Sequence, residues 1–189
     1  MEGPIVSTGS LTLHLVRHGE TPGNAERRYQ KPEVPLSDLG RSQAAAVAET
    51  LVESAAGATV ILASDYARTM ETAGIIAGRL GLPIVEEPLL RERNYGVARG
   101  RLYADFDEET RASWRSPRVR IEGGESWADV FVRVEALLAR LRSSPPAEEM
   151  VLVTHGGTMS VMLRHLAGGA VDAFVLEALE NCAVRRVVL

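Results

Sequence analysis

Five residues of this sequence carry side chains suited to phosphate chemistry, and each stands shortly after a run of apolar residues. They are Arg17, His18, Arg68, Glu92 and His155. Short apolar runs bounded by turn residues are typical of buried strands. In open α/β sheets, ligands bind beyond the carboxyl ends of the strands. If these runs form one sheet, the two histidines, two arginines and one glutamate converge on a single edge.

Together these side chains could transfer a phosphoryl group. Arginine guanidinium groups match phosphate oxygens two at a time. A neutral imidazole is a nucleophile toward phosphorus, and the cations nearby favour the neutral form of His18. A carboxylic acid can protonate the departing alkoxide, which is the role expected of Glu92. The negative charge of a bound phosphate favours the protonated carboxyl group that this role requires.

The elements that must position these residues can be read from the pattern of the chain. Five runs are predicted to be strands: 11–16, 58–64, a short one around 83–85, 150–154 and 183–189. Cys182 is expected to be a buried strand residue. A helix is expected from its capping residue Ser37 to about Glu53. Its predicted buried side consists of Leu39, Ala46, Val47 and Leu51.

Three more helices are expected between the later strands. Ser64 or Asp65 is expected to cap the first of them, which Gly81 ends. Ser126 and Asp129 resemble a capping box before a second helix. The apolar stripe of that helix consists of Trp127, Val130, Phe131, Val134, Leu137, Leu138 and Leu141. The last helix is expected at 158–166.

The alternation of strands and helices predicts the fold class. We expect an α/β, three-layer sandwich with a mostly parallel central sheet flanked by helices on both faces. The length of 189 residues suits a single domain over 1–189. Residues 1–10 read as a flexible tail. Residues 93–125 lack a clear period and read as a cover over the site.

At the candidate residues the sequence resembles a known family. The pattern is similar to that of the histidine phosphatase superfamily, the phosphoglycerate-mutase-like group. The blocks that carry the resemblance are LVRHGET at 15–21, PLSDLG at 35–40, SDYARTMETA at 64–73, LRERNYG at 90–96, GGES at 123–126 and VTHGG at 153–157. They follow one another in the right order over nearly the whole chain.

The resemblance implies a role for each candidate. His18 is the nucleophile that passes through a phosphohistidine, with its other ring nitrogen held by a backbone carbonyl. Arg17, Arg68 and His155 form the phosphate pocket, and Glu92 donates the proton. The further phosphate or substrate contacts are Asn24, Gly156, Thr21 and Tyr95. The family uses no metal, and no cofactor is expected.

Two reactions fit these residues. The first is metal-independent hydrolysis of a phosphomonoester, with a small phosphorylated metabolite as substrate. The alternative is a cofactor-dependent phosphoglycerate mutase. Only 63 positions separate Glu92 from His155. Mutases of this family carry an added segment between the corresponding residues, so the short spacing favours the phosphatase. Four residues could instead bind a substrate carboxylate and so favour the mutase: Arg93, Tyr95, Arg99 and Arg101. Arg99 stands where phosphatases of the family often have an acidic residue.

Other assignments of the same residues stay open at this point. Arg68 could form a salt bridge with Glu71 or Asp65 instead of binding phosphate. The proton donor could be another of the nearby glutamates, which are Glu86, Glu87 and Glu125. A phosphate-binding domain without catalysis is a third hypothesis. A protein substrate carrying phosphohistidine is a variant of the first.

The composition of the chain indicates which partners and which cellular location to expect. The formal net charge of −4 does not favour a nucleic-acid binder. The absence of a long apolar run argues against membrane insertion. Cys182 is the single cysteine, which excludes an intrachain disulfide. With no secretory signal at the start, a cytoplasmic location is expected. A homodimer stays open.

Overall fold

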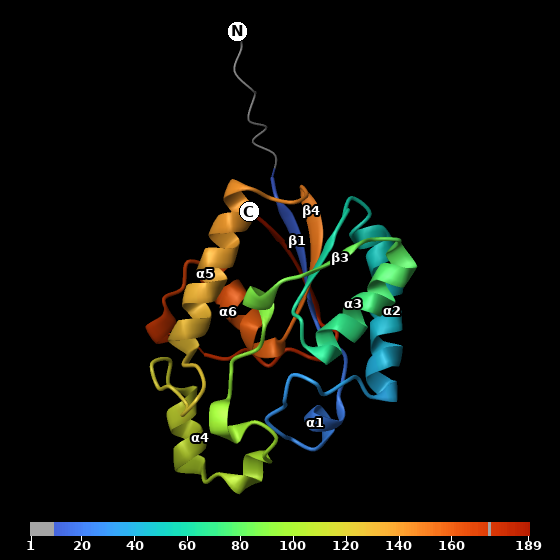
Figure 1. Ribbon diagram of the computed structural model, residues 1–189. Helices are drawn as coiled ribbons and strands as arrows, with labels where there is room; N and C mark the ends of the chain where they lie inside the picture. Colours follow the sequence, from blue (N-terminus) through green and yellow to red (C-terminus); the bar gives the residue numbers. More distant parts are fainter. Residues whose placement is uncertain (1–9, 174) are drawn as a thin grey trace.

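The computed structural model describes residues 10–173 and 175–189, which form one five-stranded sheet covered by helices on both faces (Figure 1). All but Ser10 of the predicted tail therefore lies outside the described residues. The strands are β1 (Thr12–Arg17), β2 (Ile61–Ala63), β3 (Ile84–Glu86), β4 (Glu149–Thr154) and β5 (Val184–Val188). Each of the five predicted strands is present, although β2 is shorter than its apolar run.

The sheet is mostly parallel, as predicted. Its strand order is β3-β2-β4-β1-β5. Strands β1 to β4 run parallel to one another, whereas the edge strand β5 pairs antiparallel with β1. The carboxyl ends of four strands therefore meet at one edge. In Figure 1 this edge is at the bottom, opposite both ends of the chain.

Alternate residues of the strands pack on opposite faces of the sheet, which creates two apolar layers. On one face, Leu13, Leu15 and Leu152 pack with α5 (Trp127–Ser143) and α6 (Gly156–Leu166). On the other face, Val16 and Val153 pack with α2 (Asp38–Ser54) and α3 (Ala67–Leu80). The three-layer sandwich is thus confirmed, and all seven predicted apolar residues of α5 are buried.

The predicted buried side of α2 was partly wrong. Ser37 caps the helix as expected. Leu39 is 54% exposed and Ala46 is also exposed, whereas the buried residues are Gly40, Ala44, Ala48 and Leu51. Residues three or four apart share one face of a helix. The small residues in this series allow the helix to pack closely on the sheet, so Leu39 turns to solvent.

Two helix starts and one strand residue also differ from the prediction. Neither Ser64 nor Asp65 caps α3, which begins after Tyr66, because their side chains bind other residues. The helix α6 begins at Gly156 rather than at 158, so both glycines of VTHGG lie in its first turn. Cys182 is buried as predicted, but it lies in a turn before β5, with a φ of 58°, and is not a strand residue.

The segment 93–125 contains more regular structure than its sequence indicated. It holds two 3-10 turns and the helix α4 (Glu108–Arg115), which Asp107 caps. Like the short helix α1 (Pro22–Ala25), α4 lies at the end of the molecule where the parallel strands end (Figure 1). Within the described ranges, no helix is long and apolar enough to cross a membrane.

Candidate active site

A cavity of about 300 Å³ opens beyond the carboxyl ends of β1 and β4. Seven of the nine site residues predicted from the sequence line it: Arg17, His18, Asn24, Arg68, Glu92, Tyr95 and Gly156. The other two, Thr21 and His155, lie directly behind its wall, with no exposed surface. The parallel sheet thus brings together residues that are up to 139 positions apart. We call this space the phosphate cavity.

His18 has one ring nitrogen fixed and the other available. Its Nδ1 donates a hydrogen bond to the carbonyl oxygen of Gly19 at 2.7 Å, as the family resemblance implies. The proton is therefore on Nδ1, and Nε2 carries the lone pair. Burial, followed by the charges of Arg68 and Arg17, lowers the pKa of His18 well below its ordinary value of 6.5. The ring is thus a neutral nucleophile at neutral pH.

The two arginines present unused donors. In Arg17, Nη1 is bonded to the carbonyl of Leu179, and in Arg68, Nη1 is bonded to that of Lys31 at 3.0 Å. The Nε atom of each is buried and has no hydrogen-bond partner among the described residues. Burial lowers the pKa of Arg68 to about 10, so it stays charged at neutral pH. Buried donors without partners are rare, and an anion would satisfy these.

The salt-bridge alternative for Arg68 is wrong. Asp65 binds Arg91, and Glu71 binds Arg41 and the backbone of Leu36. Both acidic side chains are thus engaged elsewhere. The Arg68 side chain is instead 3% exposed at the wall of the phosphate cavity.

His155 packs against His18, with 5.2 Å between the ring centroids. Its Nε2 lies 2.9 Å from Ser64 Oγ, whereas Nδ1 is buried without a partner among the described residues. Burial and then the charge of Arg68 lower the pKa of His155 well below 6.5. Gly156 follows it in the first turn of α6, where backbone N–H groups favour an anion.

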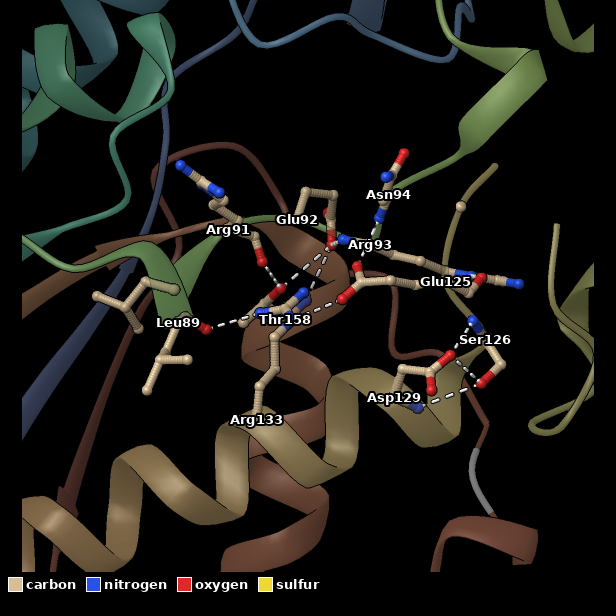
Figure 2. A network of polar contacts seen from close by, with 12 residues as sticks. Leu89, Arg91, Glu92, Arg93, Asn94, Glu125, Ser126, Asp129, Arg133 and Thr158 are labelled. Carbon is tan, nitrogen blue, oxygen red and sulfur yellow. Dashed lines mark hydrogen bonds and ion pairs between the residues drawn. The ribbon is translucent and has the colours of Figure 1, made fainter. Parts of the chain in front are cut away.

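Glu92 is held at the start of α6 (Figure 2). Its Oε2 accepts a hydrogen bond from the Gly157 N–H at 3.0 Å, and its Oε1 accepts one from the Thr158 N–H at 3.1 Å. The Arg93 N–H adds a third donor at 3.0 Å. These bonds fix the carboxyl group at the wall of the phosphate cavity.

The rival glutamates are placed elsewhere. Glu87 pairs with Arg140. Glu125 accepts a hydrogen bond from the Asn94 N–H (Figure 2). Glu86 is an exposed residue of the edge strand β3. None of the three lines the phosphate cavity. Among these glutamates, Glu92 alone is in position to act on a bound phosphoester.

Thr21 has a different role from the predicted substrate contact. Its hydroxyl lies 2.9 Å from Asn24 Oδ1 and 2.8 Å from Gln30 Oε1, and it caps α1. The side chain is fully buried and does not line the phosphate cavity. Thr21 therefore positions Asn24. Asn181 does the same from the far end of the chain, because its Nδ2 donates to Asn24 Oδ1 at 3.3 Å and to the His18 carbonyl at 3.1 Å.

Comparison with known proteins identifies the family. The family model described as "Histidine phosphatase superfamily (branch 1)" matches residues 13–189. The chain belongs to the histidine phosphatase superfamily. A relative named "Probable phosphoglycerate mutase GpmB", from Enterobacter sp. (strain 638), is 38% identical over 184 residues, which cover 94% of this chain and 84% of that protein.

Solved structures of similar proteins share the fold. A mycobacterial glucosyl-3-phosphoglycerate phosphatase in complex with VO3 matches with a TM-score of 0.83 and 31% identity, over 93% of this chain and 90% of that one. Bacillus stearothermophilus YhfR matches with a TM-score of 0.80 and 28% identity, over 93% and 90%. The names cover both phosphatases and mutases. Membership of the histidine phosphatase superfamily thus indicates an enzyme without fixing its reaction.

The three arginines predicted as possible carboxylate ligands have different environments. Arg93 is 2% exposed and donates to the carbonyls of Trp114, Val119 and Glu125, so it holds the segment 93–125 together. Arg101 is mostly exposed, 3.6 Å from Asp105. Arg99 lines the phosphate cavity, where its Nη2 donates to the Tyr66 hydroxyl at 2.7 Å. Arg93 and Arg99 thus both line the phosphate cavity, whereas Arg101 does not.

Because His18 and His155 are buried, we expect the free energy of unfolding to depend on pH. Both have a pKa that folding lowers, so below the ordinary value of 6.5 the unfolded chain binds protons that the folded chain does not. Their stabilising contribution is therefore complete above pH 6.5 and is lost as the pH falls below it. Each contributes a slope of up to about 1.4 kcal/mol per pH unit. Urea unfolding at pH 7.5, 6.5 and 5.5 should show a shallower slope below pH 6.5 for His155→Asn. Parallel curves would contradict this assignment.

The close packing of Gly40 against the loop after His18 leads to a second prediction about stability. A Cβ atom built on Gly40 would lie 2.0 Å from the Glu20 carbonyl oxygen, whereas one on Gly74 would meet nothing within 4 Å. Gly40→Ala should lower the free energy of unfolding by about 1–3 kcal/mol, because the loop must shift. Gly74→Ala, in the exposed face of α3, should raise it by about 0.5–1 kcal/mol. Denaturant titration measures both, and an unchanged Gly40→Ala protein would refute the close contact.

Proposed function

We propose that this enzyme is a metal-independent phosphomonoester hydrolase that acts through a phosphohistidine at His18. One observation carries the proposal. The His18 ring has Nδ1 tied to the Gly19 carbonyl and Nε2 available, while two arginines with unused donors flank it. A neutral nucleophile and a cationic pocket are what attack on a phosphate dianion requires.

The proposed reaction has two displacements. In the first, Nε2 of His18 forms a bond to phosphorus, the ester P–O bond breaks, and Glu92 gives its proton to the leaving alkoxide. In the second, Glu92 takes a proton from water, whose oxygen attacks the phosphohistidine. The N–P bond breaks, and inorganic phosphate leaves with the enzyme restored. Arg17 and Arg68 balance the charge on the phosphoryl oxygens throughout, which is the function that a metal ion has in other phosphatases.

The proposed substrate is a phosphorylated metabolite that a cavity of about 300 Å³ can take at its phosphate end. The similarity to a glucosyl-3-phosphoglycerate phosphatase supports hydrolysis. The proposed location is the cytoplasm, which the single cysteine, Cys182, supports. A homodimer stays a hypothesis.

A second candidate function is phosphoglycerate mutase. It is supported by relatives that carry the name of that enzyme and by Arg99, which could bind a substrate carboxylate. A mutase must keep the phosphoryl group on His18 long enough to return it to the product. Hydrolysis of the phosphoenzyme by water would compete with that step.

One assay separates the two functions. Chelator-treated protein is incubated with a panel of phosphomonoesters that includes 3-phosphoglycerate, and inorganic phosphate and 2-phosphoglycerate are measured in parallel. Phosphate release without metal is the expected result, with His18→Ala as the inactive control. Isomerisation that outruns phosphate release, after priming with bisphosphoglycerate, would instead establish the mutase.

A further inference from the structure

A second cavity, of about 470 Å³, adjoins the phosphate cavity and is lined by aromatic side chains. Tyr29, Tyr95 and Tyr103 line both spaces, so the two cavities are adjacent and share these side chains as a common boundary. Trp114 of α4 lines only the second cavity, whereas Leu176 also lines the first. We call this second space the aromatic chamber. Its volume lies within the range of small-molecule sites.

The aromatic residues of the chain are concentrated here. The whole sequence has only three Phe, two Trp and four Tyr. Five of these form one cluster around Tyr29, whose ring centroid lies 4.4 Å from Tyr103, 4.7 Å from Tyr95, 5.7 Å from Trp114 and 5.9 Å from Phe106. Every member of this cluster is partly exposed, whereas Tyr66, Trp127 and Phe131 are buried. The cluster thus keeps ring surface available to a ligand.

The chamber is held in shape by the backbone. The Tyr29 N–H donates to the Arg101 carbonyl at 2.9 Å, and the Gly100 N–H donates to the Tyr29 carbonyl at 2.6 Å. The Tyr103 N–H donates to the Arg27 carbonyl at 2.9 Å. The residues after α1 are therefore joined to the segment 93–125, so the rings do not need to be ordered when a ligand binds.

The charge around the chamber restricts the ligand further. Arg27, Arg111 and Arg115 line it, and no acidic residue does so within the described part of the chain. A cationic group would be repelled there, whereas the electron-rich face of an aromatic ring is attracted to arginine. Aromatic rings also stack favourably on Tyr and Trp.

From this geometry we infer that the alcohol part of the substrate carries a neutral or anionic aromatic ring, which occupies the aromatic chamber while the phosphate group binds beside His18. The inference rests on the proposed function, because it takes the two cavities to hold the two ends of one phosphomonoester. It narrows the substrate from any small phosphorylated metabolite to ring-bearing esters. Tyr103 is one of the three tyrosines that line both cavities, and it is the contact tested below.

Non-hydrolysable phosphonates test the inference by binding alone. Calorimetry would compare 1-naphthylmethylphosphonate with ethylphosphonate, cyclohexylmethylphosphonate and 2-aminoethylphosphonate. We expect the naphthyl compound to bind at least about tenfold more tightly than the ethyl compound, a difference of about 1.4 kcal/mol. We expect the cyclohexyl compound to bind severalfold more weakly than the naphthyl compound and the aminoethyl compound to bind most weakly.

Three variants test whether the preference for the naphthyl compound depends on the aromatic chamber. Tyr103→Ala should remove the preference for the naphthyl compound, whereas Tyr103→Phe should keep it because the ring remains. Val132→Ala, on the exposed face of α5, is the matched control and should behave as wild type. The inference is overturned if the naphthyl compound binds no more tightly than the ethyl or cyclohexyl compound, or if the preference survives Tyr103→Ala in a protein with an unchanged circular dichroism spectrum.

A separate assay reports on the proposed function. Release of phosphate from ethyl phosphate by the wild-type protein depends on His18 and does not require the chamber. If phosphate is released and the ring preference is absent, the proposed function stands and the inference fails. If the ring preference is present and no ester is hydrolysed, the inference about the ligand stands and the proposed function fails.

Discussion

Replacement of His18 by alanine is expected to abolish phosphate release, with a loss on the order of 10⁶, the size of loss seen when an enzyme loses its covalent nucleophile. Among the described residues, no other imidazole lines the phosphate cavity. His155 is the second imidazole, but it lies behind the cavity wall with no exposed surface, and its Nε2 is engaged with Ser64. Steady-state phosphate release from wild type and variant, both freed of metal by chelator, measures the effect.

The matched control is His165→Ala, which removes an imidazole from α6 at a residue that does not line the phosphate cavity. That variant should keep wild-type activity. Binding of inorganic phosphate to the His18→Ala protein should persist through Arg17 and Arg68, which shows that the site is still assembled. A folded His18→Ala protein with near-normal turnover would remove His18 from the mechanism.

Replacement of Glu92 by glutamine should have the second largest effect, and its size should depend on the leaving group. With an alkyl phosphate, whose alkoxide needs a proton to leave, the expected loss in kcat is roughly 10²–10⁴. With p-nitrophenyl phosphate, whose phenolate leaves without a proton, the loss should be much smaller. Glutamine retains the acceptor oxygen but cannot supply the proton, so the difference between the two substrates isolates the chemistry.

Glu125→Gln is the control for this prediction. Glu125 belongs to the same polar network as Glu92, yet it faces Asn94 and Arg133 and does not line the phosphate cavity. Its neutralisation should have the same small effect on both substrates. An equal loss with alkyl and nitrophenyl esters in Glu92→Gln would contradict the role of Glu92 as proton donor.

The residues at the strand ends were predictable because their positions follow from the topology. A parallel α/β sheet places the carboxyl end of every parallel strand at one edge, so Arg17, His18 and His155 had to meet there once the apolar runs were recognised. The capping box at Ser126 and the apolar stripe of α5 were predictable for a similar reason. Both are local patterns with a fixed period.

Other features of the site could not be predicted, because they depend on contacts between loops. Loop residues that pack together show no regular spacing in the sequence. The aromatic chamber combines Tyr29 with residues 66 or more positions later, and its members are single aromatic residues in polar surroundings. Asn181 reaches Asn24 from a turn near the end of the chain, with no motif to mark it. Arg93 lines the phosphate cavity, as a substrate ligand would, but its guanidinium group also donates to three carbonyls of its own segment, which no motif marks.

The central claim is that phosphate passes through His18, and trapping the intermediate tests this most directly. Chelator-treated protein would be mixed with a ³²P-labelled phosphomonoester, quenched within milliseconds in base, and the labelled site identified by mass spectrometry. The account predicts a label on His18 that is stable to base, is lost in acid, and is absent from the His18→Ala protein. Phosphate release that proceeds with no label on His18, or with the label on another residue, would contradict it.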